Sequence, residues 1–398
     1  MCLHKIDNLP FPYFHGVIFF LLVLFLSAHA GATTPPGSAE YFVYVGTYTE
    51  NGSASKGIYL YRFNATLHKL TSVGLAAPTI NPSFLAIDSN RRFLYAVNEV
   101  SNYQGKKSGA VSAFSINPAS GKLKLLNQVA SAGADPCYVT VDATGKYVLV
   151  ANYTGGSIAV FPILQDGRLG EASAFIQHTG HGTNPERQEG PHAHSIDLSP
   201  DNRFAIADDL GLDETLVYKF DPANGSLTLE KDAGVKADAG AGPRHFTFAP
   251  DGRFAYVLTE MGSTISALSY QASDGHLKRL QTISTLPKDF KGHNDAAEIQ
   301  VHPSGKFLYA SNRGHDSIAV FAVDPDKGTL SNVEYVPTRG SSPRNFTIDP
   351  TGSLLLVGNE KSDDIVVFRI NPTTGRLTPT GTVLEISQPV CIRFVAVK

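Results

Sequence analysis

Short apolar segments separated by polar turns follow one another along most of the chain. Residues 147–151 (YVLVA), 254–258 (FAYVL) and 307–311 (FLYAS) are examples, and β-branched and aromatic residues dominate them. Such segments, bounded by glycine, proline and aspartate, predict β-strands. No segment after residue 38 has a long apolar period of 3.6 residues, so we expect almost no helix.

The strands recur as a repeat. Cutting the chain where a proline precedes an apolar strand gives units of about 46 to about 55 residues, a spacing typical of propeller blades. Within a unit, an Asp/Pro–Gly turn joins the first two strands and a Gly-x-Leu turn precedes the fourth. The cuts fall at Pro82, Pro136, Pro191, Pro243, Ala296, Pro343 and Pro389. Four short antiparallel strands per unit predict one blade of a β-propeller.

The two ends of the repeat indicate how the ring closes. Residues 41–47 resemble a second strand, with no first strand before them, whereas residues 388–395 resemble a first strand with nothing after them. The sequence therefore predicts an all-β, seven-bladed β-propeller closed by its C-terminal strand, which joins the first blade. Closure removes the exposed sheet edges at the two chain ends.

Composition separates the first residues from the rest. Residues 1–30 combine Lys5, an apolar run over residues 17–26 and an Ala-x-Ala site at residues 28–30, which predicts a signal peptide. An uncleaved anchor is the alternative. We expect a linker over residues 31–38 and the propeller over residues 39–398, periplasmic or secreted, with no membrane contact after cleavage.

Charge and cysteine content exclude several classes of partner. The net charge is −3, so no basic field would attract nucleic acid. Cys137 and Cys391 lie in apolar strands and are expected to be small buried residues. Because a closed propeller exposes few strand edges, we expect a monomer.

One mouth of the channel is predicted to carry the chemistry. In an antiparallel blade, strand one starts and strand two ends at the same end of the propeller. Arginines, histidines and carboxylates gather at these positions, whereas the opposite mouth receives ordinary turns. The candidates for catalysis are His194, Arg244, Glu260 and Arg313, and those for substrate binding are His192, Glu298, Arg344, Asn152 and Asn312.

These residue types favour acid–base work on an anionic ester. Arginine forks match carboxylate or phosphate and can stabilise an oxyanion, and His194 together with Glu260 or Glu298 could shuttle a proton or activate water. Each polar group could instead satisfy neighbouring strands. His245 follows Arg244 in an alternating strand and is expected to point away. His192 and His194 could bind a metal, but no third ligand is evident, so we predict neither metal nor cofactor.

Four motifs carry a family resemblance over nearly all of residues 39–398. They are residues 43–49 (VYVGTYT), 190–195 (GPHAHS), 242–245 (GPRH), and 297–299 (AEI) together with 311–314 (SNRG). The chain resembles the propeller lactonases, which include bacterial 6-phosphogluconolactonases of the propeller type and fungal carboxymuconate lactonising enzymes. This resemblance implies that His194, Arg244, Glu260 and Arg313 act at the channel mouth.

The resemblance implies hydrolysis of an acidic sugar or aromatic-pathway lactone as a small-molecule substrate. An exported chain would not meet a cytosolic sugar phosphate, so the reaction class carries over more readily than the substrate. Two alternatives stay open. One is a carboxymuconate-type cycloisomerase, and the other is a non-catalytic exported binding propeller, because one fold hosts many functions.

Overall fold

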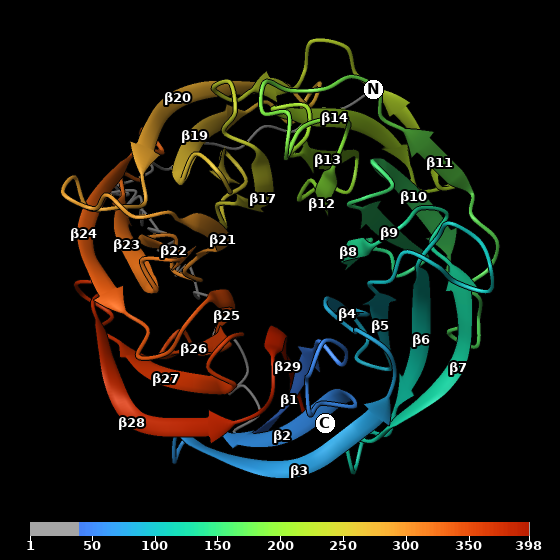
Figure 1. The fold of residues 1–398 in the computed structure, drawn as a ribbon, viewed down its shortest axis with the longest axis horizontal. Helices are drawn as coiled ribbons and strands as arrows, with labels where there is room; N and C mark the ends of the chain where they lie inside the picture. Colours follow the sequence, from blue (N-terminus) through green and yellow to red (C-terminus); the bar gives the residue numbers. More distant parts are fainter. Residues whose placement is uncertain (1–39, 398) are drawn as a thin grey trace, which may run out of the picture. The chain divides into compact units, whose positions relative to one another are not determined.

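The computed structural model describes residues 40–397, which form a ring of seven β-sheets around a central channel (Figure 1). All regular elements among these residues are strands, as the sequence predicts. The signal peptide predicted over residues 1–30, the linker over residues 31–38 and the last residue of the chain lie outside the described part. Within it, no helix is long and apolar enough to cross a membrane.

Each sheet is one blade, numbered here along the chain and listed from the channel outwards. Blade 1 has β29 (Pro389–Ala396), β1 (Glu40–Thr47), β2 (Gly57–Asn64) and β3 (Lys69–Pro78); blade 2 has β4 (Leu85–Ile87), β5 (Phe93–Asn98), β6 (Ala110–Ile116) and β7 (Leu123–Ala130). Blade 3 has β8 (Pro136–Val141), β9 (Tyr147–Asn152), β10 (Ser157–Pro162) and β11 (Ala174–Gln177). Blade 4 has β12 (Ala193–Leu198), β13 (Phe204–Asp209), β14 (Glu214–Asp221) and β15 (Ser226–Leu229), with β16 (Val235–Lys236) also on β14.

The remaining three blades repeat the four-stranded pattern. Blade 5 has β17 (Pro243–Phe248), β18 (Phe254–Thr259), β19 (Thr264–Tyr270) and β20 (Leu277–Ser284). Blade 6 has β21 (Asp295–Val301), β22 (Phe307–Arg313), β23 (Ser317–Val323) and β24 (Leu330–Pro337). Blade 7 has β25 (Pro343–Ile348), β26 (Leu354–Asn359), β27 (Asp364–Ile370) and β28 (Leu377–Glu385).

The C-terminal strand closes the ring, which confirms the prediction. β29 pairs antiparallel with β1, with Val43 opposite Phe394, and so supplies the inner strand that the first blade otherwise lacks. On its other side β29 contacts β25 and β4, the inner strands of blades 7 and 2. The first and last strands of the described chain are therefore held in one sheet, so the first blade has its full four strands.

Buried tyrosines tie neighbouring blades together. The Tyr44 hydroxyl of blade 1 donates to the Gly121 carbonyl of blade 2 at 2.7 Å, and Tyr309 of blade 6 donates to Gly375 of blade 7 at 2.8 Å. Both glycines belong to the repeated Gly-x-Leu turn and have positive φ, 71° and 72°. Glycine adopts this conformation without strain, so the repeated turn also serves as the contact between blades.

A bulge near the start of the inner strand recurs around the ring. In blade 5 the pairing passes from Pro243↔Thr259 directly to His245↔Leu258, leaving Arg244 as an extra residue. Blades 3, 4 and 7 have the same irregularity at Cys137, His194 and Arg344. Because a bulge re-aims side chains and interrupts alternation, it changes which residues can face the channel.

Candidate functional site

Two positions of each blade supply the residues of one channel mouth. The first is the bulge residue of the inner strand. The second is the residue that follows the buried end of strand two, occupied by Glu260 in blade 5 and by Arg313 at the corresponding place in blade 6. The two positions lie side by side because the inner two strands of a blade run antiparallel.

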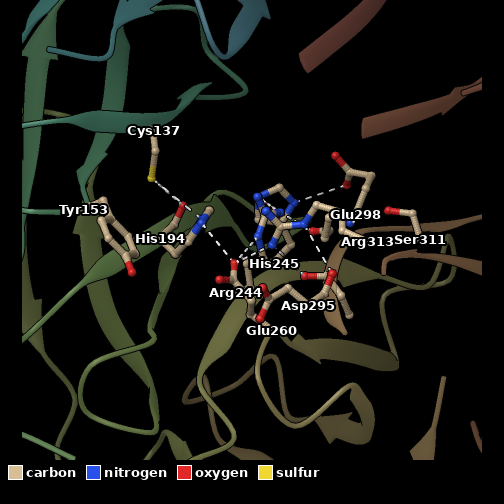
Figure 2. A network of polar contacts seen from close by, with 12 residues as sticks. Cys137, Tyr153, His194, Arg244, His245, Glu260, Asp295, Glu298, Ser311 and Arg313 are labelled. Carbon is tan, nitrogen blue, oxygen red and sulfur yellow. Dashed lines mark hydrogen bonds and ion pairs between the residues drawn. The ribbon is translucent and has the colours of Figure 1, made fainter. Parts of the chain in front are cut away.

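Glu260 is the centre of the main cluster. Its Oε2 atom lies 2.8 Å from Arg244 Nε and 2.9 Å from Arg313 Nη2, and its Oε1 atom lies 2.5 Å from Arg187 Nη2. The Nε2 atom of His194 lies 3.8 Å from Oε2. Figure 2 shows Arg244, Arg313 and His194 directed towards this carboxylate from separate blades.

The arginines decide the charge of Glu260. Burial by itself would raise the pKa of this carboxyl, but the charges of Arg313 and Arg244, followed by His194 and Arg187, hold the pKa well below its usual range. Glu260 is therefore ionised near neutral pH and is a weak proton acceptor. The sequence left water activation to His194 or Glu260, and because three arginines already occupy the oxygens of Glu260, His194 is the candidate base.

His194 is buried and neutral. Burial, together with the nearby charge of Arg244, lowers the pKa of His194 well below its usual range. On the other side of its ring, Nδ1 lies 3.7 Å from Cys137 Sγ, and that thiol donates to the His194 carbonyl oxygen at 3.3 Å. Burial raises the pKa of Cys137, so its thiol stays protonated. Nε2 is the ring nitrogen of His194 that faces the Glu260 cluster.

A chain of hydrogen-bonded side chains, His245, Glu298 and Asn345, holds Arg244 in place. Arg244 Nη1 lies 3.1 Å from His245 Nε2, and His245 Nδ1 lies 3.4 Å from Glu298 Oε1. Arg244 can only donate, so His245 accepts at Nε2 and carries its proton at Nδ1, towards Glu298. Asn345 Nδ2 donates to the other oxygen of Glu298.

The expectation that His245 points away is wrong. Its ring lies 5.3 Å from the His194 ring and 5.2 Å from the Tyr138 ring, inside the channel. The bulge at Arg244 breaks the alternation on which the expectation was based, so consecutive side chains both face the channel. Glu298, a predicted substrate-binding residue, lies in this chain of supporting side chains, where its carboxylate holds His245.

Arg344 belongs to a different part of the mouth. Its guanidinium carbon lies 5.3 Å from the centre of the Tyr48 ring, and no hydrogen bond or ion pair joins it to another described residue. The Tyr48 hydroxyl donates to Glu99 at 3.0 and 3.1 Å. Arg344 thus presents an unpaired cation to the channel, consistent with its predicted role in substrate binding.

Three predicted substrate-binding residues are not brought into the cluster. Asn152 and Asn312 are fully buried and donate to Ser131 and Thr285 carbonyls at 3.1 and 2.8 Å, which fixes the connections that lead into their blades from the preceding blades. We assign them to the frame of the site. His192 stacks on Tyr153 at 4.6 Å, with Nε2 3.2 Å from Glu189, and forms no hydrogen bond or ion pair with Glu260.

Two residues of the site, Tyr153 and Arg187, were not predicted from the sequence. Tyr153 follows Asn152, one residue beyond the end of β9, and its ring lies edge-on to His194 at 5.4 Å. Counting one residue further in each blade would have found it. Arg187 comes from the long segment between β11 and β12, where no repeat exists to align it, so only the folded chain places it on Glu260.

The arrangement suits proton transfer next to hydrogen-bond donors that can stabilise a negative charge. It combines a neutral imidazole with arginine N–H groups in a buried place, where such charges act strongly. Residues 40–397 contain no group of three or more His, Cys, Asp or Glu side chains placed to hold a metal ion.

Comparisons with known proteins agree with this geometry. The sequence model of a family described as lactonase, 7-bladed beta-propeller, matches residues 42–394. The 6-phosphogluconolactonase of Bacillus subtilis is 39% identical over 356 residues, which are 89% of this chain and 98% of that protein.

Two solved structures are similar along nearly their whole length. One is a crystal structure of a putative 6-phosphogluconolactonase from Bacteroides fragilis, with a TM-score of 0.82 and 40% identity over 90% of this chain and 98% of that chain. The other is the periplasmic gluconolactonase of Pseudomonas aeruginosa, with a TM-score of 0.85 and 36% identity over 90% of this chain and 100% of that chain.

Proposed function

The chain belongs to the seven-bladed β-propeller lactonase family, and on that premise we propose that it hydrolyses a lactone at the channel mouth around Glu260. The observation that carries the proposal is the neutral His194 imidazole 3.8 Å from a carboxylate that three arginines hold. This is a base beside a set of oxyanion donors, the combination that ester hydrolysis needs.

The proposed reaction begins with water. His194 Nε2 accepts a proton as the water oxygen forms a bond to the lactone carbonyl carbon. The carbonyl oxygen becomes an oxyanion, which N–H groups of Arg244 and Arg313 stabilise. When the intermediate collapses, the bond between that carbon and the ring oxygen breaks. The ring oxygen takes the proton from His194, and the product is an open-chain hydroxy acid.

Glu260 has a positioning role in this scheme. Its two oxygens fix Arg187, Arg244 and Arg313, and its negative charge stabilises the imidazolium that forms on His194. The His245–Glu298 pair holds Arg244 through a contact with Nη1, and Arg244 also donates to the Ala297 carbonyl. Because these partners already fix the arginines, little reorganisation is needed when the oxyanion forms.

We propose an acidic lactone as substrate, with Arg344 as a further contact in the channel, and an exported, monomeric enzyme. The unpaired guanidinium of Arg344 supports an anionic ligand. The predicted signal peptide and the periplasmic gluconolactonase of Pseudomonas aeruginosa support export.

The test is proton release from three lactones: gluconolactone, 6-phosphogluconolactone and a carboxylated muconolactone. We expect turnover of at least one, and a fall of about 10²–10⁴-fold in kcat in His194→Gln, the range for loss of a general base. His192→Gln is the matched control and should stay within about threefold of the parent, since His192 faces Glu189. Absence of turnover above the spontaneous rate with every lactone would contradict the hydrolase proposal.

A further inference from the structure

A cleft of about 590 Å³ opens beside the Glu260 cluster. Three loop segments line it: residues 184–187 before β12, residues 261–263 after β18, and residues 292–295 before β21. Arg187 is the one arginine or lysine among its lining residues. Because Arg187 also binds Glu260, this side chain joins the cleft to the reacting centre.

Arg187 differs from the other two arginines of the cluster in how it is held. Arg244 and Arg313 lie at bulge and strand-end positions, with side chains 2% and 15% exposed, and each donates to backbone carbonyls of blade 6. Arg187 is 35% exposed, and its hydrogen bonds go only to side chains, Glu260 and Tyr153. Its guanidinium is therefore the one that can turn without disturbing a strand.

The backbone around Arg187 is fixed even though its side chain is not. The neighbouring Gln188 is buried and donates at 2.8 Å both to the Leu210 carbonyl and to Asp213. Asn184 Oδ1 accepts from the backbone N–H groups of Glu186 and Arg187 at 3.0 and 3.2 Å. A guanidinium on a fixed base loses little backbone entropy when it binds a ligand.

Arg187 also has N–H groups that form no hydrogen bond with the described residues. Its hydrogen bonds to Glu260 and Tyr153 both use Nη2, Nη1 lies 3.9 Å from Asp295 Oδ1, and Nε–H forms no hydrogen bond with another described residue. A guanidinium has five N–H groups arranged to bind an oxyanion with two parallel hydrogen bonds. If Arg187 turned, Glu260 would keep Arg244 and Arg313 as partners.

The remaining lining groups restrict where an anion can sit. Asp295 and Glu186 are carboxylates, and Asp295 Oδ2 lies 3.1 Å from His293 Nε2. Both carboxylates oppose an anion, and Asp295 does so close to Arg187, since its Oδ1 lies 3.9 Å from Arg187 Nη1. Arg187 is the lining group that attracts an anion into the cleft, while Asn184, Ser263 and Asn294 offer hydrogen bonds to hydroxyl groups.

We propose that this cleft is a substrate subsite in which Arg187 exchanges Glu260 for the phosphate or carboxylate group of an anionic sugar lactone. The inference rests on the proposed lactonase function. It makes Arg187 a specificity-determining residue: Arg244 and Arg313 act on the ester of any lactone, whereas Arg187 selects lactones that carry a second, anionic group.

The experiment compares kcat/KM for 6-phosphogluconolactone, gluconolactone and glucaro-1,4-lactone, which carry a phosphate, no anion and a carboxylate, in the parent protein, Arg187→Gln and Arg187→Lys. We expect Arg187→Gln to lose about 10–100-fold more on at least one anionic lactone than on gluconolactone, the range for a charge-assisted hydrogen bond. The loss should fall mainly on KM, and Arg187→Lys should recover part of it. Arg253→Gln, an exposed arginine paired with Asp251 in the turn of blade 5 at the opposite mouth, is the matched control.

Equal losses on charged and neutral lactones would mean that Arg187 only positions Glu260, and unchanged kinetics would mean that it does nothing; either result overturns the proposal. Binding of inorganic phosphate, measured by calorimetry, separates this proposal from the proposed function. If the parent hydrolyses no lactone yet binds phosphate, and Arg187→Gln does not, the anion site stands without the lactonase. If both bind phosphate equally or neither does, and no charge-dependent loss is seen, the anion site is refuted.

Discussion

Glu260 and Glu99 occupy the same position of the repeat in blades 5 and 2, yet their surroundings are opposite. Three arginines contact Glu260 within 2.9 Å and hold its pKa well below the usual range. Glu99 receives the Tyr48 hydroxyl instead, and burial raises its pKa although Arg344 opposes the shift. One carboxyl is locked as an anion, and the other is more easily protonated.

The difference originates in the neighbours that each blade supplies. The bulge residue of blade 5 is Arg244, directly beside Glu260, and the next blade adds Arg313. The arginine whose charge opposes the shift at Glu99 is Arg344, which packs on Tyr48 and makes no ion pair with the described residues. Equivalent backbone positions thus give different chemistry, because the charges around a carboxyl set its protonation state.

The largest contrast is expected between Arg244→Lys and Arg344→Lys. Lysine keeps the charge but cannot bridge Glu260, His245 and the Ala297 carbonyl together, so kcat of Arg244→Lys should fall by about 10²–10³-fold. Arg344→Lys should raise KM by at most about tenfold with kcat nearly unchanged, because its guanidinium packs on Tyr48 but makes no hydrogen bond or ion pair with the described residues. Steady-state kinetics on the preferred lactone, with far-UV circular dichroism to verify folding, check both. Similar losses of kcat would remove the distinction between the two sides of the mouth.

The second contrast uses Glu260→Gln, Glu99→Gln and pH. Because the pKa of His194 is lowered, kcat/KM of the parent should stay constant as the pH falls through 6.5. The acid limb of the pH profile, where kcat/KM falls as His194 is protonated, should lie at lower pH. The charge of Glu260 raises the pKa of His194, so Glu260→Gln should move that limb to still lower pH. It should also cost about 10–100-fold in kcat.

Glu99→Gln is the control and should leave the limb in place, since Glu99 is not among the charges that set the pKa of His194. If kcat/KM of the parent falls near pH 6.5, His194 is not the base. The same conclusion follows if Glu99→Gln shifts the acid limb of the pH profile and Glu260→Gln does not.

The smallest effect concerns stability. Burial and the charge of Arg244 lower the pKa of His245 to about 4, whereas the unfolded chain has an ordinary histidine near 6.5. The unfolded state therefore binds the proton first. The stability that neutral His245 contributes is complete above pH 6.5 and is lost as the pH falls towards 4, by about 3 kcal/mol at most. Urea unfolding at pH 7 and pH 4.5 should show His245→Gln to be less pH-dependent than the parent, with His276→Gln, an exposed histidine, as the reference.

The sequence analysis named Asn152 but not the next residue, Tyr153, and the reason is local. Asn152 and Asn312 have their side chains turned into the blade, so the mouth is formed by the residues that follow, Tyr153 and the predicted Arg313. Successive strand residues face opposite sides, so an error of one position exchanges a frame residue for a site residue. The same alternation gave the wrong direction for His245, because a bulge intervenes.

The sequence by itself determined the all-β fold, the seven repeats and the closure by β29, because strand periodicity and turn residues are local signals that each unit repeats. It also indicated which mouth carries His194, Arg244, Glu260 and Arg313. Only the tertiary structure decided that Arg187 reaches Glu260, that Glu298 supports His245, and that the pKa values of Glu260 and Glu99 shift in opposite directions. Burial and the distances between charges from different blades govern these features, and neither is written in the local order of residues.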